Sequence, residues 1–137
     1  MTDMRKFMAR FVDFINTADP AKAQDLVAAD ARFHVPGQPE PLVGPAGYLA
    51  IIAMMRSGFS DIQWQLEDMV ADGTSVAARF TMRGTHDGAF MGVPATGRSI
   101  AVQAMNLYHL DGGRIVQEFG QPDLMGLMMQ IGAIPQP

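Results

Sequence analysis

The sequence predicts a single α+β domain in which helices cover an antiparallel sheet. Apolar residues recur every three or four positions in the first 60 residues and at every second position from residue 62 onward. Tight turns join the later segments, and strands joined in this way pair antiparallel. Because 137 residues is the size of one domain, we expect residues 1–137 to share one core and one site.

The first part of the chain contains three predicted helices and one strand. An apolar stripe predicts a helix over residues 7–16. Asp19 and the proline after it have the pattern of a cap and a first helical turn, so a second helix is expected over 20–29. Residues 31–35 predict a short strand, and a Pro-rich loop separates it from a helix over 44–57.

The second part contains four predicted strands and a last helix. Alternating apolar residues predict strands over 62–67 and 76–82, joined by an Asp-Gly turn. A longer strand over 100–110 is followed by an Asp-Gly-Gly turn and a strand over 114–121. Residues 124–130 predict a terminal helix. A sheet with one apolar face must be covered, so a pocket is expected between this sheet and the N-terminal helices.

Composition excludes several classes of function. The net charge is −4 and the ten Lys and Arg residues are scattered, which argues against a nucleic-acid partner. No apolar run has the length of a membrane helix, and the first residues lack the layout of a signal peptide, so we expect a cytoplasmic protein. There is no cysteine, and the three histidines lack the spacing of metal ligands. We therefore expect no metal and no nucleotide cofactor.

Polar residues interrupt the apolar rows of three predicted strands. Asn106 stands in the inward row of the strand over 100–110. An uninterrupted alternation places Gln117, Gln121 and, beyond the strand, Asp123 on the inward side of the last strand. His86 continues the inward parity of the strand over residues 76–82. A polar side chain on an apolar face needs a partner or a role, so these residues predict a site.

Each of these residues also has a structural explanation. Asp123 precedes the last helix and is well placed as its N-cap. Asn106 is also explained as a satisfied buried amide, and His86 as a turn residue. Gln117 and Gln121 are equally explained as side chains that face water at the edge of the sheet.

A longer motif points to one family. Residues 79–98, RFTMRGTHDGAFMGVPATGR, resemble the R-x-x-x-x-G-T-H-x-G-x-F-x-G-x-P-P-T-G-K/R segment of the SnoaL-like polyketide cyclases, within the nuclear transport factor two superfamily. Residues 111–119, Asp123 and residues 127–132 are similar to later elements of that family. The resemblance covers essentially the whole chain. It implies a cone-shaped α+β barrel, in which a strongly curved, antiparallel or mixed sheet wraps around the N-terminal helices and leaves a deep apolar pocket.

The resemblance also implies a reaction. An aspartate at the position of Asp123 is the acid/base of the family's cyclases and removes an α-proton before aldol ring closure, without a cofactor. Asn106 and His86 are then candidates to hold the enolate oxygen. Gln117 and Phe119 stand where the family usually has Glu and Trp.

A hydrophobic carbonyl compound is the expected substrate or ligand. The residues expected to contact it are aromatic or polar: His34, Tyr48, Trp64, Gln117, Phe119 and Gln121. A non-catalytic protein that binds or carries a small molecule is the alternative function. With either function, a homodimer is expected through the outer sheet face that bears Arg79, Thr81 and Arg83.

Overall fold

A computed structural model of the chain describes residues 3–135 and contains four helices and a six-stranded sheet in that range. The helices are α1 (Met4–Thr17), α2 (Pro20–Leu26), α3 (Gly44–Gly58) and α4 (Leu124–Gln130). The strands are β1 (Val27–His34), β2 (Leu42–Val43), β3 (Gln63–Asp72), β4 (Ser75–Thr85), β5 (Ser99–Asp111) and β6 (Arg114–Pro122). The α+β class predicted from the sequence is confirmed.

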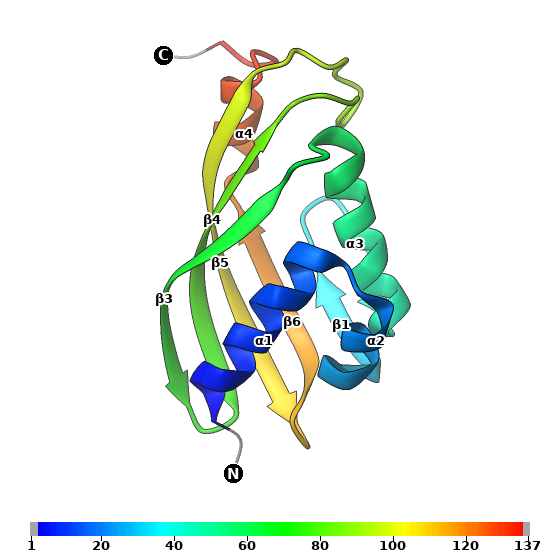
Figure 1. The fold of residues 1–137 in the computed structure, drawn as a ribbon, viewed down its shortest axis with the longest axis vertical. Coiled ribbons are helices and arrows are strands. Elements are labelled where there is room, and N and C mark those ends of the chain that lie inside the picture. The colour runs from blue at the N-terminus through cyan, green and yellow to red at the C-terminus, as the bar shows by residue number, and fades with distance from the viewer. Residues whose placement is uncertain (1–2, 136–137) are drawn as a thin grey trace.

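The strands lie in the order β2-β1-β6-β5-β4-β3. Strands β3, β4, β5 and β6 form an antiparallel meander, as expected. Tight turns join β3 to β4 and β5 to β6, and a loop of residues 86–98 joins β4 to β5. In contrast, β1 pairs with β6 in parallel, so the sheet is mixed. Figure 1 shows α1 lying across the sheet, α3 beside β1, and α4 at the opposite end of the sheet from the N-terminus.

Helix α1 forms where its apolar stripe predicts it. The carboxylate of Asp3 caps its N-terminus by accepting hydrogen bonds from the backbone N–H groups of Arg5 and Lys6. Ala18 ends the helix in the left-handed conformation, and its N–H donates to the carbonyl of Phe14. The side chains that face the sheet are buried: Phe7, Met8, Phe11, Phe14 and Ile15.

The second helix is shorter than predicted. Asp19 caps it as expected, but it ends at Leu26, and the chain is extended from Val27. Val27 is β-branched and pairs with Ile115 of β6, so its side chain is buried as part of a strand. Tertiary pairing thus overrides the weak helical pattern of residues 27–29.

The inward rows of β4 and β5 follow the predicted alternation. Val76, Ala78, Phe80 and Met82 are buried on β4, and Ile100, Val102, Ala104, Tyr108 and Leu110 are buried on β5. The two strands pair in continuous register from Ser75 opposite His109 to Thr85 opposite Ser99. On the other face, Thr81 donates a hydrogen bond of 2.9 Å to Glu67 of β3. This side of the sheet is called the outer face below.

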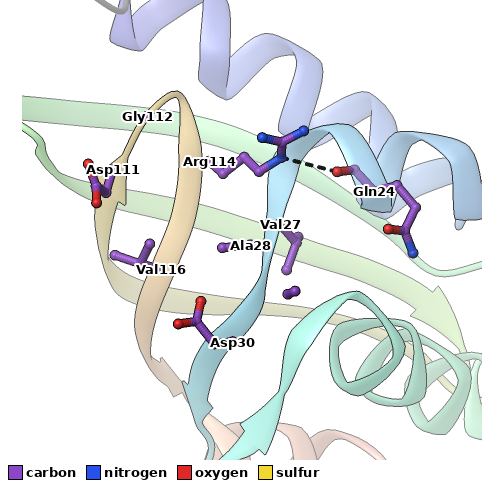
Figure 2. A pocket seen from close by; sticks show the side chains of 9 residues that line it. Gln24, Val27, Ala28, Asp30, Asp111, Gly112, Arg114 and Val116 are labelled. Atoms are coloured by element: carbon purple, nitrogen blue, oxygen red, sulfur yellow. Dashed lines mark hydrogen bonds between the residues drawn. The ribbon is translucent and has the colours of Figure 1, made fainter.

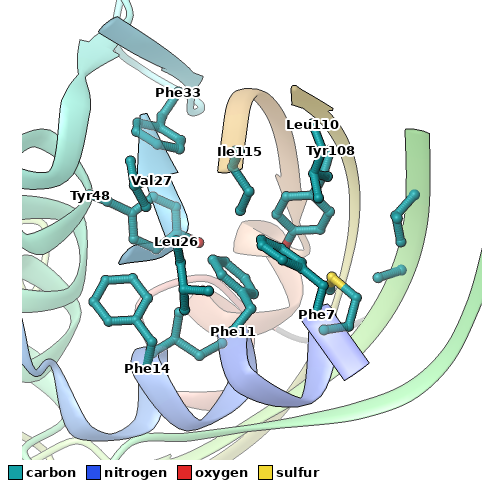
Figure 3. Close-up of a cluster of buried hydrophobic side chains, with 14 of the residues drawn as sticks. Phe7, Phe11, Phe14, Leu26, Val27, Phe33, Tyr48, Tyr108, Leu110 and Ile115 are labelled. Atoms are coloured by element: carbon teal, nitrogen blue, oxygen red, sulfur yellow. The ribbon is translucent and has the colours of Figure 1, made fainter. Parts of the chain in front are cut away.

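Two apolar clusters fill the space between the sheet and the helices. The aromatic cluster gathers residues of α1, α2, α3 and all strands except β2 around Phe11. The ring of Phe11 lies 5.5 Å from that of Tyr48 and 5.2 Å from that of Tyr108 (Figure 3). The distal cluster comprises Met55, Phe59, Ile62, Met82, Phe90, Ile100, Val102, Leu127 and Ile131. The half-buried ring of Trp64 packs against both clusters. Within residues 3–135 no helix has the length and apolarity needed to span a membrane.

Candidate active site

A bulge in β6 reverses the predicted orientation of its polar residues. Leu110 pairs with Ile115 but His109 pairs with Gln117, so Val116 is an extra residue in the ladder. Beyond it the inward positions are Glu118 and Gly120, which are buried. Gln117, Phe119 and Gln121 therefore lie on the outer face, and the prediction that Gln117 and Gln121 point inward is wrong. An extra residue flips every later side chain to the opposite face.

The bulge places Glu118 in the aromatic cluster. This carboxyl is 4% exposed, and its Oε1 accepts a hydrogen bond of 3.0 Å from the hydroxyl of Tyr48 on α3. Tyr108, on β5, pairs directly with Glu118 in the ladder, and its hydroxyl favours the ionised form of the carboxyl. The sequence argument missed this acid because it assumed an unbroken strand. The extra residue in the ladder has no clear sequence signal.

The buried carboxyl has an unusual acidity. Burial raises the pKa of Glu118 from 4.5 to about 8, and the hydrogen bonds from Tyr48 and Tyr108 limit the rise. Burial, with the nearby carboxyl, also raises the pKa of both tyrosines well above the usual value. Glu118 is therefore mostly a neutral carboxylic acid at neutral pH, able to donate a hydrogen bond or a proton.

Asn106 extends this network along β5. Its Oδ1 accepts a hydrogen bond of 3.1 Å from the backbone N–H of Gln121, which fixes the orientation of the amide. Its Nδ2 donates to the hydroxyl of Tyr108 at 3.0 Å. One of the two Nδ2 hydrogens remains for another acceptor. Asn106 is partly exposed, whereas the inward residues on either side of it, Ala104 and Tyr108, are 3% and 1% exposed.

Gly120 leaves a space beside these two side chains. It lies directly opposite Asn106 in the sheet. A Cβ atom on Gly120 would lie 3.4 Å from Oε2 of Glu118 and 3.5 Å from Oδ1 of Asn106. The carboxyl and the amide therefore border the same small space, which we call the Gly120 recess.

Asp123 lies at the start of α4. Its backbone N–H donates to the carbonyl of Gln103 on β5 at 2.8 Å. Gln103 is three residues before Asn106, which corresponds to about 10 Å along the strand. Oδ1 of Asp123 accepts from the backbone N–H of Gly126 at 2.8 Å, so the carboxylate is the N-cap of α4. Asp123 is an exposed residue, and no hydrogen bond holds its Oδ2 in the described structure.

His86 is separate from the Glu118 network. It is fully buried, and its ring lies 5.3 Å from that of Phe59 in the distal cluster. Its Nδ1 contacts the hydroxyl of Thr96 at 2.9 Å and accepts from the Thr96 N–H at 3.3 Å, so the ring proton of the neutral form lies on Nε2. Among residues 3–135 that Nε2 has no partner. His86 thus holds the loop between β4 and β5 and keeps one buried donor unused.

The other residues predicted to bind substrate fall into two groups. Tyr48 and Trp64 are on the inner side: Tyr48 joins Glu118, while the backbone of Trp64 exchanges two hydrogen bonds with the side chain of Asn16. His34 lies on the outer face, where its ring stacks on Phe119 at 4.5 Å with Gln117 beside it. Three predicted groups, the Asn106 amide, the Asp123 cap and His86, do not converge on one point.

A separate hollow of about 470 Å³ lies between α2, β1 and the turn that joins β5 to β6 (Figure 2). The register of β1 against β6 shifts here, between Val27 and Arg32. Arg114 crosses one side and donates a hydrogen bond of 3.2 Å to the carbonyl of Gln24. The lining is open and mixed in polarity, and it contains none of the predicted site residues. Nowhere in residues 3–135 are three or more His, Asp or Glu side chains grouped to hold a metal ion.

Comparison with known proteins identifies the family to which the chain is similar. The family model described as SnoaL-like polyketide cyclase matches residues 4–131. Aklanonic acid methyl ester cyclase DnrD of Streptomyces peucetius is 30% identical over 93 residues, which are 66% of this chain and 63% of that cyclase. The chain thus spans less than two thirds of the length of this relative. Aklanonic acid methyl ester cyclase AcmA of Streptomyces galilaeus is 26% identical over 96% of this chain and 92% of its own.

The fold has close counterparts among solved structures. IdmH of Streptomyces antibioticus superposes with a TM-score of 0.85 at 30% identity, over 96% of this chain and 99% of its own. TsrD of Streptomyces laurentii gives the same TM-score at 28% identity, over 98% of this chain and 100% of its own.

Proposed function

Because the chain belongs to the SnoaL-like polyketide cyclase family, we propose that it closes a ring on a polyketide-derived ketone by cofactor-independent aldol addition. In this reaction a base removes an α-proton, and the resulting enolate carbon attacks a second carbonyl of the same molecule. The reaction requires a base, donors for the enolate oxygen and an apolar surface for the substrate. The chain offers a candidate for each requirement.

The observation that carries the proposal is the orientation of Asn106. Its amide is fixed by Gln121 and Tyr108, and one Nδ2 hydrogen remains for the oxygen of a substrate. A donor that is already oriented stabilises negative charge without rearrangement during the reaction. Asn106 is therefore the proposed enolate donor.

Asp123 is the proposed base. Its Oδ2 is free of hydrogen bonds within the described structure and the residue is open to solvent, so a carboxylate oxygen is available for a proton. The buried Nε2–H of His86 is the second proposed donor, used by a substrate that reaches the distal cluster. Tyr48 and Trp64 supply aromatic surface on the inner side of the sheet.

A carrier of a hydrophobic ligand is the second candidate function. One observation favours it: Asp123 uses Oδ1 to cap α4 and is surrounded by solvent, whereas a base gains strength from an apolar environment. With this function the same inner surface binds the ligand, and no bond is made.

The Asp123→Asn variant separates the two functions, because asparagine is also a good N-cap but has no basic carboxylate. Turnover of aklanonic acid methyl ester and nogalonic acid methyl ester is measured for the wild type and the variant, together with the thermal shift that each ligand induces. Asp19→Asn makes the same change at the cap of α2 and is the control. The cyclase function predicts turnover that falls by at least about 100-fold only in Asp123→Asn. A ligand-induced thermal shift without turnover in the wild type supports the carrier function. Equal turnover in the wild type and Asp123→Asn shows that Asp123 is not the base.

A further inference from the structure

The Gly120 recess is bordered by the carboxyl group of Glu118 as well as by the amide of Asn106. Glu118 directs Oε2 to this space, because a Cβ on Gly120 would lie 3.4 Å from that oxygen. Its other oxygen is held by Tyr48. One carboxyl oxygen is thus fixed by the protein, and the other borders the recess beside Oδ1 of Asn106, where the oxygen of the attacked carbonyl would have to lie.

The network leaves the carboxyl able to give up a proton. The orientation of the Asn106 amide makes Tyr108 an acceptor from Nδ2, so the hydroxyl hydrogen of Tyr108 is available to Glu118. The hydrogen bond from Tyr48 and the neighbouring hydroxyl of Tyr108 then support the carboxylate that remains after proton transfer. The titratable groups that face Glu118 in the described structure are these two tyrosines; α1 and β1 contribute the apolar rings of Phe11 and Phe33 to the cluster.

We propose that Glu118 is the general acid of the ring closure and protonates the oxygen of the attacked carbonyl. This inference rests on the proposed cyclase function. As the new C–C bond forms, the electron pair of the C=O π bond moves to oxygen, and that oxygen takes the carboxyl proton of Glu118. Glu118 becomes a carboxylate, and the proton that Asp123 removed returns to it through water after the product leaves. The step consumes no oxidant, reductant or co-reactant.

The acidity of Glu118 suits this role. Its pKa of about 8 keeps the proton on the carboxyl below that pH. An acid with a pKa near the working pH is efficient because it is protonated and still gives up its proton readily. An ordinary exposed glutamate would be ionised and could not protonate the new alkoxide.

The test compares kcat against pH for the wild type, Glu118→Gln and Tyr48→Phe. The wild-type kcat should fall above about pH 8. Tyr48→Phe removes a hydrogen bond that lowers the pKa of Glu118, so the fall should move to higher pH. Glu118→Gln should lose about 100-fold in kcat and lack this fall. Glu40→Gln makes the same change in an exposed loop and should match the wild type.

The outcomes separate this inference from the proposed function. Suppose that the wild type turns over the substrate. If kcat of Tyr48→Phe then falls at the same pH as in the wild type, or if Glu118→Gln keeps the wild-type dependence of kcat on pH, Glu118 is not the acid. The cyclase function stands in that case. If the wild type does not turn over, the cyclase function fails. Binding of 2-naphthol then tests the carboxyl directly. The affinity for 2-naphthol should change across pH 8 in the wild type and not in Glu118→Gln. The same pH dependence of affinity in both proteins would overturn the role of Glu118.

Discussion

The hydroxyl of Tyr48 lies 3.0 Å from Oε1 of Glu118, so a buried carboxyl on β6 is tied directly to helix α3. Stability should depend on pH because of this carboxyl. The folded state holds the proton more tightly than the unfolded state, with a pKa of about 8 against 4.5. The stabilisation is therefore complete below pH 4.5 and is lost as pH rises to about 8.

This loss is at most about 1.4 kcal/mol per pH unit in the free energy of unfolding. Urea denaturation of the wild type and Glu118→Gln at several pH values measures it as the difference between the two curves. The difference in the free energy of unfolding should change between pH 4.5 and about pH 8 and become constant above that range. A constant difference would mean that Glu118 is already ionised in the folded protein.

Substitutions of Gly126 and Asp123 should have strongly coupled effects on the free energy of unfolding. A Cβ on Gly126 would lie 2.8 Å from Cγ of Asp123, so alanine there displaces the capping carboxylate. In the wild type, the lost cap costs about 1 kcal/mol and offsets the gain of about 1 kcal/mol from replacing a helical glycine. In an Asp123→Ala background only the gain remains, so Gly126→Ala should stabilise. A double-mutant cycle by thermal unfolding measures the coupling; additive effects would contradict the cap geometry.

His86 should hold the loop between β4 and β5. His86→Leu leaves the N–H and the hydroxyl of Thr96 without their acceptor, and we expect a loss of about 1–3 kcal/mol in the free energy of unfolding. Asparagine can place an oxygen near the position of Nδ1, so His86→Asn should lose less. Urea denaturation measures both, and hydrogen exchange at Gly97 reports on the loop. Equal losses would show that packing against Phe59 is the main contribution.

The outer face should pair two copies of the chain. Met105, Leu107 and Phe119 are 56%, 38% and 39% exposed on β5 and β6. Burial of such a surface drives association, so analytical ultracentrifugation should show a dimer. Met105→Glu should yield a monomer, whereas Met54→Glu, at an exposed position on helix α3, should leave the dimer intact. A wild-type monomer would reject this interface.

Elements with a long, unbroken period were predictable from the sequence. The stripe of α1 and the alternation of β4 and β5 depend on local geometry, and both match the structure. The end of α2 was not predictable in this way, because Val27 is held in a strand by Ile115, a residue far along the chain. Such a partner leaves no mark in the local sequence.

The candidate site shows the same limit more clearly. Asn106 was found because β5 is regular, and Asp123 because a cap has a local pattern. Glu118 was missed and Gln117 was placed on the wrong face because of one extra residue, Val116. A period-two argument holds only as far as the next bulge.

The parallel pairing of β1 with β6 also constrains how the chain folds. His34 meets Gln117, 83 residues later, so β1 must wait for nearly the whole chain to be synthesised before its partner exists. Closing so long a loop is entropically costly, and non-local pairing slows folding. Until then Ala31 and Phe33 have no β6 to pack against, while each strand from β3 to β6 pairs with the next strand along the chain. Addition of β1 is thus a late step, and the same step completes the surroundings of Glu118.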